Sequence, residues 1–257
     1  MKQLILITND DGIYSPGLKA AAEAVRELGD LMIAAPRHQQ TSMSRAFPKA
    51  DDLGVIEIVE LEISHAKRTA YAIHGSPAFA VSHAVLELCD RRPALCISGI
   101  NYGENLGLSV FPSGTIGAAL EADTYDIPAL AVSLEASIDM QHSSEYNPLD
   151  WEVAKYFTAH FAANILRDGL PRRTALLNVN IPRTAKPDTE IRITHQSRQN
   201  YFVFRKPEPR DFSKSFRLRV ETEVDYETLE SDSDIKAFVV DRVVSVTPLT
   251  WDLTTKT

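Results

Sequence analysis

Two neighbouring carboxylates, Asp10 and Asp11, directly follow an apolar run from Leu4 to Thr8. The run is typical of a buried strand in a parallel sheet that is covered on both faces. Because like charges repel, both carboxylates can be ionised in a dry pocket only beside a compensating positive charge. Arg37 is the one obvious basic candidate near the predicted strand ends, and a bound divalent cation is the other solution. A third interpretation stays open for the pair alone, in which one Asp caps a helix and the other points to solvent.

Further oxygen-bearing side chains follow other predicted strands. Thr41 and Ser42 come after the second strand, and Asn101 comes after a later one. Ligands of open α/β sheets bind outside the carboxyl ends of the strands, so these side chains are expected at one edge. Carboxylate, hydroxyl and amide oxygens, without His or Cys, suit a hard cation such as Mg²⁺ or Mn²⁺. The pattern therefore favours a metal site at Asp10, Asp11, Thr41 and Asn101, with Ser42 as the alternative hydroxyl.

The segment Ser113-Gly114-Thr115 precedes an Ala-rich helix expected over 116–122. Hydroxyl and N–H groups at a helix N-terminus bind anions, although simple N-capping is the alternative interpretation. Beside a metal, this segment predicts a phosphate that bridges the cation and the helix, with Asn105 as a further donor. No G-x-G-x-x-G follows the first strand and no P-loop is present, which argues against dinucleotide and NTP sites.

The elements that must position these residues alternate along the chain. Strands are expected at 4–8, 31–35, 69–73, 94–97, 129–134 and 176–181, and helices at 16–28, 77–88, 115–122 and 149–167. Alternating strands and helices indicate an α/β fold with a Rossmann-like, doubly wound, mostly parallel sheet.

The chain changes character beyond Pro182. Glu190 to Thr194 and Phe216 to Val224 are expected to pair as an antiparallel hairpin, with a polar, basic stretch between them. Because this extended arm is too polar to form its own core, we expect it to pack on another subunit. The tail from Val243 to Leu249 is expected to rejoin the body as a strand. The predicted organisation is a catalytic body at 1–184, an oligomerisation arm at 185–240 and a returning strand and tail at 241–257.

Composition excludes several classes of protein. The 257 residues include 27 basic and 35 acidic side chains, a formal charge of −8, which argues against binding to a nucleic-acid polymer. No apolar stretch approaches the roughly 20 residues that span a bilayer, and no signal peptide is recognisable. The two cysteines, Cys89 and Cys96, are expected to be free thiols. We expect a cytoplasmic protein without a membrane partner.

Several long blocks resemble the signature sequences of the SurE family, the survival-protein nucleotidases. These are LILITNDDGIYSPG (4–17), SGINYGENLG (98–107), PSGTIGAALEA (112–122) and IPALAVSL (127–134). Shorter blocks at 74–84, 176–182 and 244–249 are similar to further landmarks, in the family's order.

The resemblance implies a metal-dependent phosphatase of nucleoside 5′- and 3′-monophosphates, with a swapped C-terminal arm in a homodimer or homotetramer. Some family members also act on polyphosphate. By this resemblance, one cation per subunit is held by Asp10, Asp11, the Thr41–Ser42 region and Asn101. The substrate phosphate is held by Asn105, Ser113, Gly114 and Thr115.

One loop departs from the family pattern. The family typically has APDRNRSG after the second strand, whereas this chain has APRHQQTS at 35–42. The departure keeps three alternatives open: a binding protein without activity, an enzyme of altered specificity, and a broad acid phosphatase.

The mechanism that we expect is metal-assisted hydrolysis of a phosphomonoester. Asp10 or Asp11 acts as nucleophile or as general base, and the sequence does not separate these roles. Two rival classes fit less well. A signalling receiver module needs a phosphoacceptor Asp and a later Lys, and phosphatases with a D-x-D-x-[T/V] motif differ from NDDGI.

Overall fold

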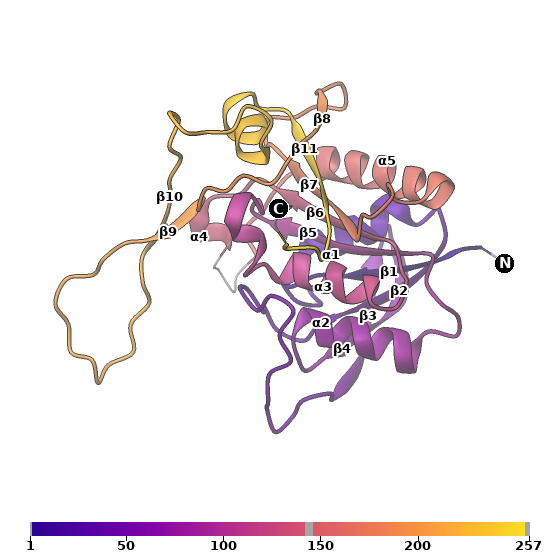
Figure 1. Ribbon diagram of the computed structural model, residues 1–257. Helices are drawn as coiled ribbons and strands as arrows, with labels where there is room; N and C mark the ends of the chain where they lie inside the picture. Colours follow the sequence, from indigo (N-terminus) through magenta and orange to yellow (C-terminus); the bar gives the residue numbers. More distant parts are fainter. Residues whose placement is uncertain (1, 142–145, 255–257) are drawn as a thin grey trace.

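The computed structural model describes residues 2–141 and 146–254. Within these ranges the centre is a nine-stranded sheet of order β3-β4-β2-β1-β5-β6-β7-β11-β8 (Figure 1). The six central strands run parallel to one another. Their bounds are β4 (Ala66–Ile73), β2 (Asp30–Pro36), β1 (Leu4–Thr8), β5 (Leu95–Tyr102), β6 (Ala129–Leu134) and β7 (Leu176–Ile181). The predicted Rossmann-like, mostly parallel α/β fold is confirmed.

The antiparallel pairs lie toward the two edges of the sheet. β3 (Ile56–Ile63) pairs with β4, and β11 (Val244–Leu249) pairs with β7. The return of the C-terminal segment as β11 confirms the sequence expectation. β3 was not expected from the sequence.

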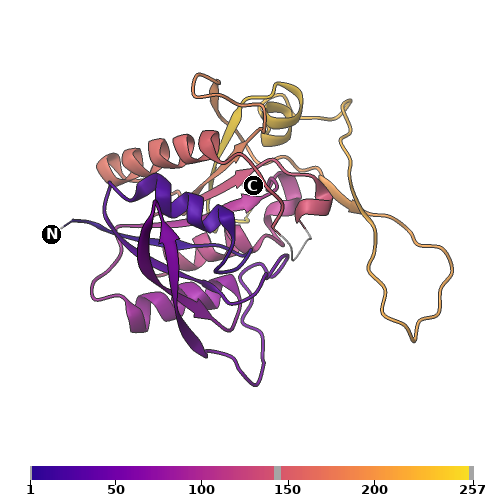
Figure 2. The ribbon, with the colours of Figure 1, turned by 180° about the vertical axis from the view of Figure 1, so that it is seen from behind.

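Helices cover both faces of the sheet (Figures 1 and 2). α1 (Pro16–Val25) packs with α5 (Glu152–Asp168) on one face, and α2 (Pro77–His83) packs with α3 (Gly114–Asp123) on the other. Shorter helical turns lie at Ala84–Leu88, Gly107–Val110, Ile138–Gln141 (α4) and Lys236–Val240. In the ranges that the structure describes, no helix is long and apolar enough to cross a bilayer.

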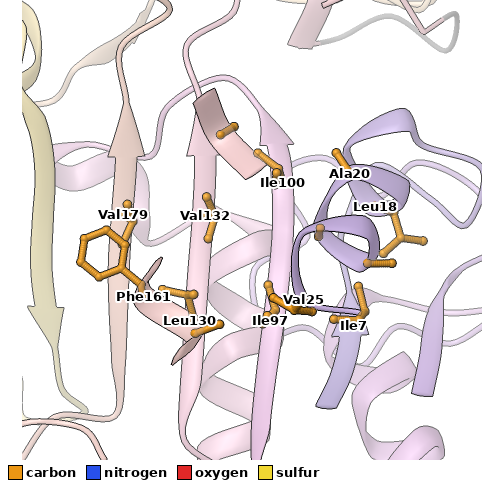
Figure 3. Close-up of a cluster of buried hydrophobic side chains, with 14 of the residues drawn as sticks. Ile7, Leu18, Ala20, Val25, Ile97, Ile100, Leu130, Val132, Phe161 and Val179 are labelled. Atoms are coloured by element: carbon orange, nitrogen blue, oxygen red, sulfur yellow. The ribbon is translucent and has the colours of Figure 1, made fainter. Parts of the chain in front are cut away.

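The burial of the central strands on both faces explains why their sequences are unbroken apolar runs. All five residues of β1 are buried, because helices cover both of its faces. Figure 3 shows the cluster beneath α1 and α5, in which β-strand side chains meet Leu18, Val25 and Phe161 of the helices. Its strand members include Ile7, Ile97, Leu130, Val132 and Val179. This packing fixes the ends of β1 and β5, from which the polar site residues project.

The C-terminal arm differs from the sequence expectation. β9 (Phe202–Phe204) pairs antiparallel with β10 (Val220–Thr222), and the chain between them projects from the body as a long loop (Figure 1). β8 (Ile191–Ile193) instead joins the main sheet, parallel to β11. The predicted pairing of Glu190–Thr194 with Phe216–Val224 is therefore wrong. The backbone of β8 pairs with the outer edge of β11, and β9 pairs with β10 to form the hairpin.

Candidate active site

Asp10 and Asp11 lie at the carboxyl end of β1, against the N-terminus of α3. Both are buried, with exposed fractions of 5% and 3%. The turn behind them is closed by Asn9, whose side chain accepts from the Gly12 N–H and donates to the Gly12 carbonyl. Gly12 has φ +100°, a left-handed conformation that favours glycine, and it approaches the backbone of Gln39 closely. The turn therefore brings the loop after β2 to the carboxylates.

Asp10 is held by α3. Its Oδ1 accepts from Thr115 Oγ1 at 2.7 Å, and the backbone N–H groups of Gly114 and Thr115 favour its charged form. A Cβ on Gly114 would stand 2.7 Å from the Asp10 Cβ, so only glycine permits this approach. Asp10 is thereby fixed in position by the first turn of a helix.

Asp11 is held less closely. Its Oδ2 accepts from the Tyr102 N–H at 3.3 Å, and the side chain of Gln39 also favours its charged form. Its carbonyl oxygen accepts from Tyr146 Oη at 3.0 Å. Gln39 Nε2 in turn donates to the Gln141 carbonyl, which joins the loop after β2 to α4.

The electrostatics of the pair are unfavourable without a cation. Burial raises the pKa of Asp10 to about 6, and burial together with the Asp10 charge raises the pKa of Asp11 well above its usual value. Arg37 pairs with Glu57, and Arg45 pairs with Glu121. Within residues 2–141 and 146–254, no Lys, Arg or His forms an ion pair with either carboxylate. Arg37 is therefore not the compensating charge.

Asn101 lies near the end of β5, the strand beside β1. Its Nδ2 donates to the Gly103 carbonyl at 2.7 Å. This hydrogen bond fixes which end of the amide is free: Oδ1, the atom that binds hard cations, has no donor among the described residues.

The loop with Thr41 and Ser42 is anchored to both β1 and α3. The Gln40 N–H donates to the Asp10 carbonyl at 2.7 Å, and the Ser44 N–H donates to the Pro112 carbonyl at 3.0 Å. Thr41 is half-buried, whereas Ser42 is exposed and has φ 64°. The loop thus runs past the Asp10 turn, and Thr41 is the more enclosed of the two hydroxyl residues.

The hydroxyls of Ser113 and Thr115 at the start of α3 have different roles. Ser113 Oγ accepts from the Ile116 N–H, which confirms it as the N-cap and leaves its O–H able to donate to a ligand. Thr115 is fully buried and donates to Asp10, so its hydroxyl supports the carboxylate. Ser113 is the residue of this segment whose donor can face a phosphate, because the Gly114 N–H favours the charged form of Asp10.

Asn105 lies in a separate buried network. Its Nδ2 donates to Ser133 Oγ at 2.9 Å, and its backbone groups bond to the side chains of Asn178 and Asn180. The structure therefore brings together Asp10, Asp11, Asn101, the Thr41 loop and the α3 N-terminus, and holds the Asn105 side chain in other contacts.

The donor set fits one hard divalent cation. It comprises two carboxylates, one amide oxygen and a loop hydroxyl, and Mg²⁺ and Mn²⁺ bind such oxygens. No group of three or more His, Cys, Asp or Glu suited to a metal occurs in the described part of the chain, so a site here needs the amide and hydroxyl as well. A cation would supply the positive charge that the buried pair lacks.

The model of the family described as "Survival protein SurE" matches residues 5–203. The chain belongs to the SurE family. It is 36% identical over 255 residues to the 5′-nucleotidase SurE of Thermococcus kodakarensis, covering 98% of this chain and 94% of that protein. It is 38% identical over 260 residues to the 5′-nucleotidase SurE of Methanocella arvoryzae, with coverage of 99% and 94%. The SurE crystal structure from Aquifex aeolicus matches with a TM-score of 0.74 and 27% identity, over 98% and 94% of the two chains.

Two residues of this SurE site were given no role by the sequence-based predictions. Gln39 faces Asp11, and Tyr146 reaches the Asp11 carbonyl from 135 residues away. The position of Gln39 in the loop after β2 is a usable signal, because ligands collect at strand ends. Tyr146 lies between predicted elements and gives no such signal.

Proposed function

We propose that this SurE-family chain is a metal-dependent phosphomonoesterase that hydrolyses nucleoside 5′- and 3′-monophosphates. The observation that carries the proposal is the buried Asp10–Asp11 pair, which lies against a helix N-terminus without a cationic side chain in the described residues. The names of the relatives from Thermococcus and Methanocella, both 5′-nucleotidases, support the substrate class.

The cation site of the proposal is formed by Asp10, Asp11, Asn101 Oδ1 and the Thr41 hydroxyl. The greater burial of Thr41 favours it over Ser42. When bound, Mg²⁺ or Mn²⁺ polarises a phosphoryl oxygen and lowers the pKa of a coordinated water. Thr115 and the α3 N–H groups hold Asp10 in place for this binding.

The chain's own residues orient the substrate. The Ser113 hydroxyl binds a phosphoryl oxygen at the positive end of the α3 dipole, beside Gly114, whose N–H holds Asp10. Asp10 is held at Oδ1 by Thr115, so it serves as a fixed ligand. Asp11 is held less closely, with 3.3 Å from the Tyr102 N–H to its Oδ2, and it is the carboxylate that we assign to accept the proton of the attacking water.

The proposed assembly is a homodimer or homotetramer formed through the arm. Large aromatic side chains on the projecting segment are exposed, among them Phe204 and Phe212. Exposed apolar groups of this kind are typical of surfaces that pack against another chain.

The test is a phosphate-release assay on chelator-treated protein, with and without added Mn²⁺ or Mg²⁺. The panel contains nucleoside 5′- and 3′-monophosphates, sugar phosphates and polyphosphate, so that the alternatives of a broad phosphatase or altered specificity are separate outcomes. Asp10→Asn is expected to lower kcat about a thousandfold or more. Asp188→Asn, at an exposed position, is the matched control. Full activity of Asp10→Asn with metal present, or no metal-dependent release from any substrate, overturns the proposal.

A further inference from the structure

A cavity of about 410 Å³ lies at the same edge of the sheet as the candidate metal site. Its walls come from the segments that follow β5, β6 and β7, and from the root of the arm. Glu104, Ser137 and Thr184 line it from the body, and Tyr201 and Thr222 line it from the arm.

Glu104 is the unusual group in this wall. It is only 5% exposed, and its Oε1 accepts from Tyr201 Oη at 2.8 Å. Its Oε2 is buried and has no hydrogen bond of good geometry in the described residues, although the backbone N–H groups of Glu104 and Ala136 favour the charged carboxylate. Leaving a buried carboxylate oxygen without a donor costs free energy, and burial also raises the pKa of Glu104 to about 7. A ligand that donates a hydrogen bond would remove this cost.

The cavity is joined to the metal site through two short segments of the chain. Glu104 follows Asn101 by three residues, and the Asn101 side chain donates to the Gly103 carbonyl between them. On the other side, Gln141 Nε2 donates to the Ala136 carbonyl of the cavity wall, while its own carbonyl accepts from Gln39. The β5 and β6 ends stand about 5 and 10 Å from the β1 end, because neighbouring strands are about 4.8 Å apart. A ligand can therefore reach from the carboxylate pair to this cavity.

The chemistry of the wall selects a neutral ligand with hydroxyl groups. Glu104 repels a second anion, and Glu135 is already neutralised by Arg242, with 2.9 Å between Nη1 and Oε1. Ser137, Thr184 and Thr222 offer hydroxyls that donate and accept, and Arg183 offers donors. Carboxylates bind ribose hydroxyls in this way in dinucleotide-binding folds.

We propose that this cavity binds the ribose of a nucleoside monophosphate, with the Glu104 carboxylate accepting a hydrogen bond from a sugar hydroxyl. The proposal rests on the proposed function, since the phosphate of the same molecule lies at the α3 N-terminus. Glu104 is thereby a residue that determines specificity for nucleotides over simpler phosphate esters.

The test compares Glu104→Gln with the wild type on adenosine 5′-monophosphate and on phenyl phosphate, which has no sugar. Glutamine keeps the shape of the side chain but lacks the charge. The KM for the nucleotide is expected to rise about tenfold or more, because a hydrogen bond to a charged group is lost. The kcat/KM for phenyl phosphate is expected to stay within about twofold. Glu227→Gln, at an exposed position, is the matched control and leaves both substrates unaffected.

The outcomes separate the two proposals. If the wild type hydrolyses neither substrate, the proposed function fails. If the wild type is active but Glu104→Gln changes neither substrate, or weakens both equally, the cavity proposal fails and the phosphatase stands. Should Glu104→Gln not fold, the wild type is compared on adenosine and 2′,3′-dideoxyadenosine 5′-monophosphates. A KM at least about tenfold lower for the ribonucleotide supports the ribose site, and equal KM values overturn it.

Discussion

Arg45 and Glu121 form an ion pair, with 2.5 Å between Nε and Oε2, that joins the loop after β2 to helix α3. The Glu121 side chain is only 4% exposed, and it also accepts from Ser82 Oγ at 2.7 Å. Nearby, a Cβ on Gly117 would stand 2.1 Å from the Ser44 carbonyl oxygen, so the loop lies directly on the helix. The pair thus fixes the loop that carries Thr41 and that is bonded to the Asp10 carbonyl through the Gln40 N–H.

Glu121→Gln is expected to weaken Mn²⁺ binding about tenfold, because Arg45 loses its charged partner and the Thr41 loop gains freedom. Isothermal titration of chelator-treated protein with Mn²⁺ measures the effect. The matched control is Glu60→Gln, which breaks an ion pair with Lys67 whose side chains are 65% and 77% exposed. Exposed pairs contribute little to stability, so this variant keeps wild-type affinity. Equal affinities of both variants and the wild type would contradict a positioning role for Glu121.

The Asp10–Asp11 pair is expected to destabilise the metal-free chain at neutral pH. Both folded-state pKa values are raised by burial, so the folded chain binds protons more readily than the unfolded chain. The contribution of the pair to the free energy of unfolding therefore becomes unfavourable as the pH rises through about 6, the raised pKa of Asp10. At pH 7.5 and without metal, Asp11→Asn is expected to melt a few degrees above the wild type.

Thermal unfolding at pH 5 and pH 7.5, with chelator or with Mn²⁺, measures this effect. The advantage of Asp11→Asn shrinks at pH 5, where the wild-type pair is protonated. Mn²⁺ raises the melting temperature of the wild type only, because a ligand stabilises the state that binds it. A metal-free Asp11→Asn variant that melts below the wild type at pH 7.5 would show that the buried charges are compensated by the protein itself.

Local sequence patterns predicted the body of the fold, and they named the residues that the candidate site is proposed to use. The apolar run at Leu4–Thr8 and the helices expected from residues 16 and 77 depend on neighbouring residues, and the structure has β1 over Leu4–Thr8 and helices that begin at Pro16 and Pro77. The strand over Ile56–Ile63 was missed, although its alternating Ile and Glu residues are typical of a half-exposed strand. Pairings between distant segments could not be predicted from local sequence patterns. Which strand β9 meets, and which acid Arg45 meets 76 residues away, depend on how preformed elements pack.

Thr41→Ala is expected to lower Mn²⁺ affinity about tenfold, whereas Ser42→Ala leaves it unchanged. The reason is placement: Thr41 is half-buried in the anchored loop, and Ser42 is exposed with φ 64°. Titration calorimetry on both variants decides between the two hydroxyls. If Ser42→Ala lowers the Mn²⁺ affinity and Thr41→Ala does not, Ser42 is the ligand. If neither variant changes the affinity, the loop supplies no hydroxyl ligand to the cation.

Replacing Phe204 and Phe212 together by Ser is expected to weaken self-association of the chain. Phe204 and Phe212 are 69% and 87% exposed on the projecting arm, and burying such side chains against a second copy is favourable by about 1.5–3 kcal/mol each. Sedimentation equilibrium is expected to show a wild-type dimer or tetramer and a variant whose dissociation constant is at least about a hundredfold higher. Leu86→Ser is the matched control, since Leu86 is also 69% exposed but lies on the body. A wild type that sediments as a monomer, or a double variant that assembles like Leu86→Ser, would exclude the arm as the contact between subunits.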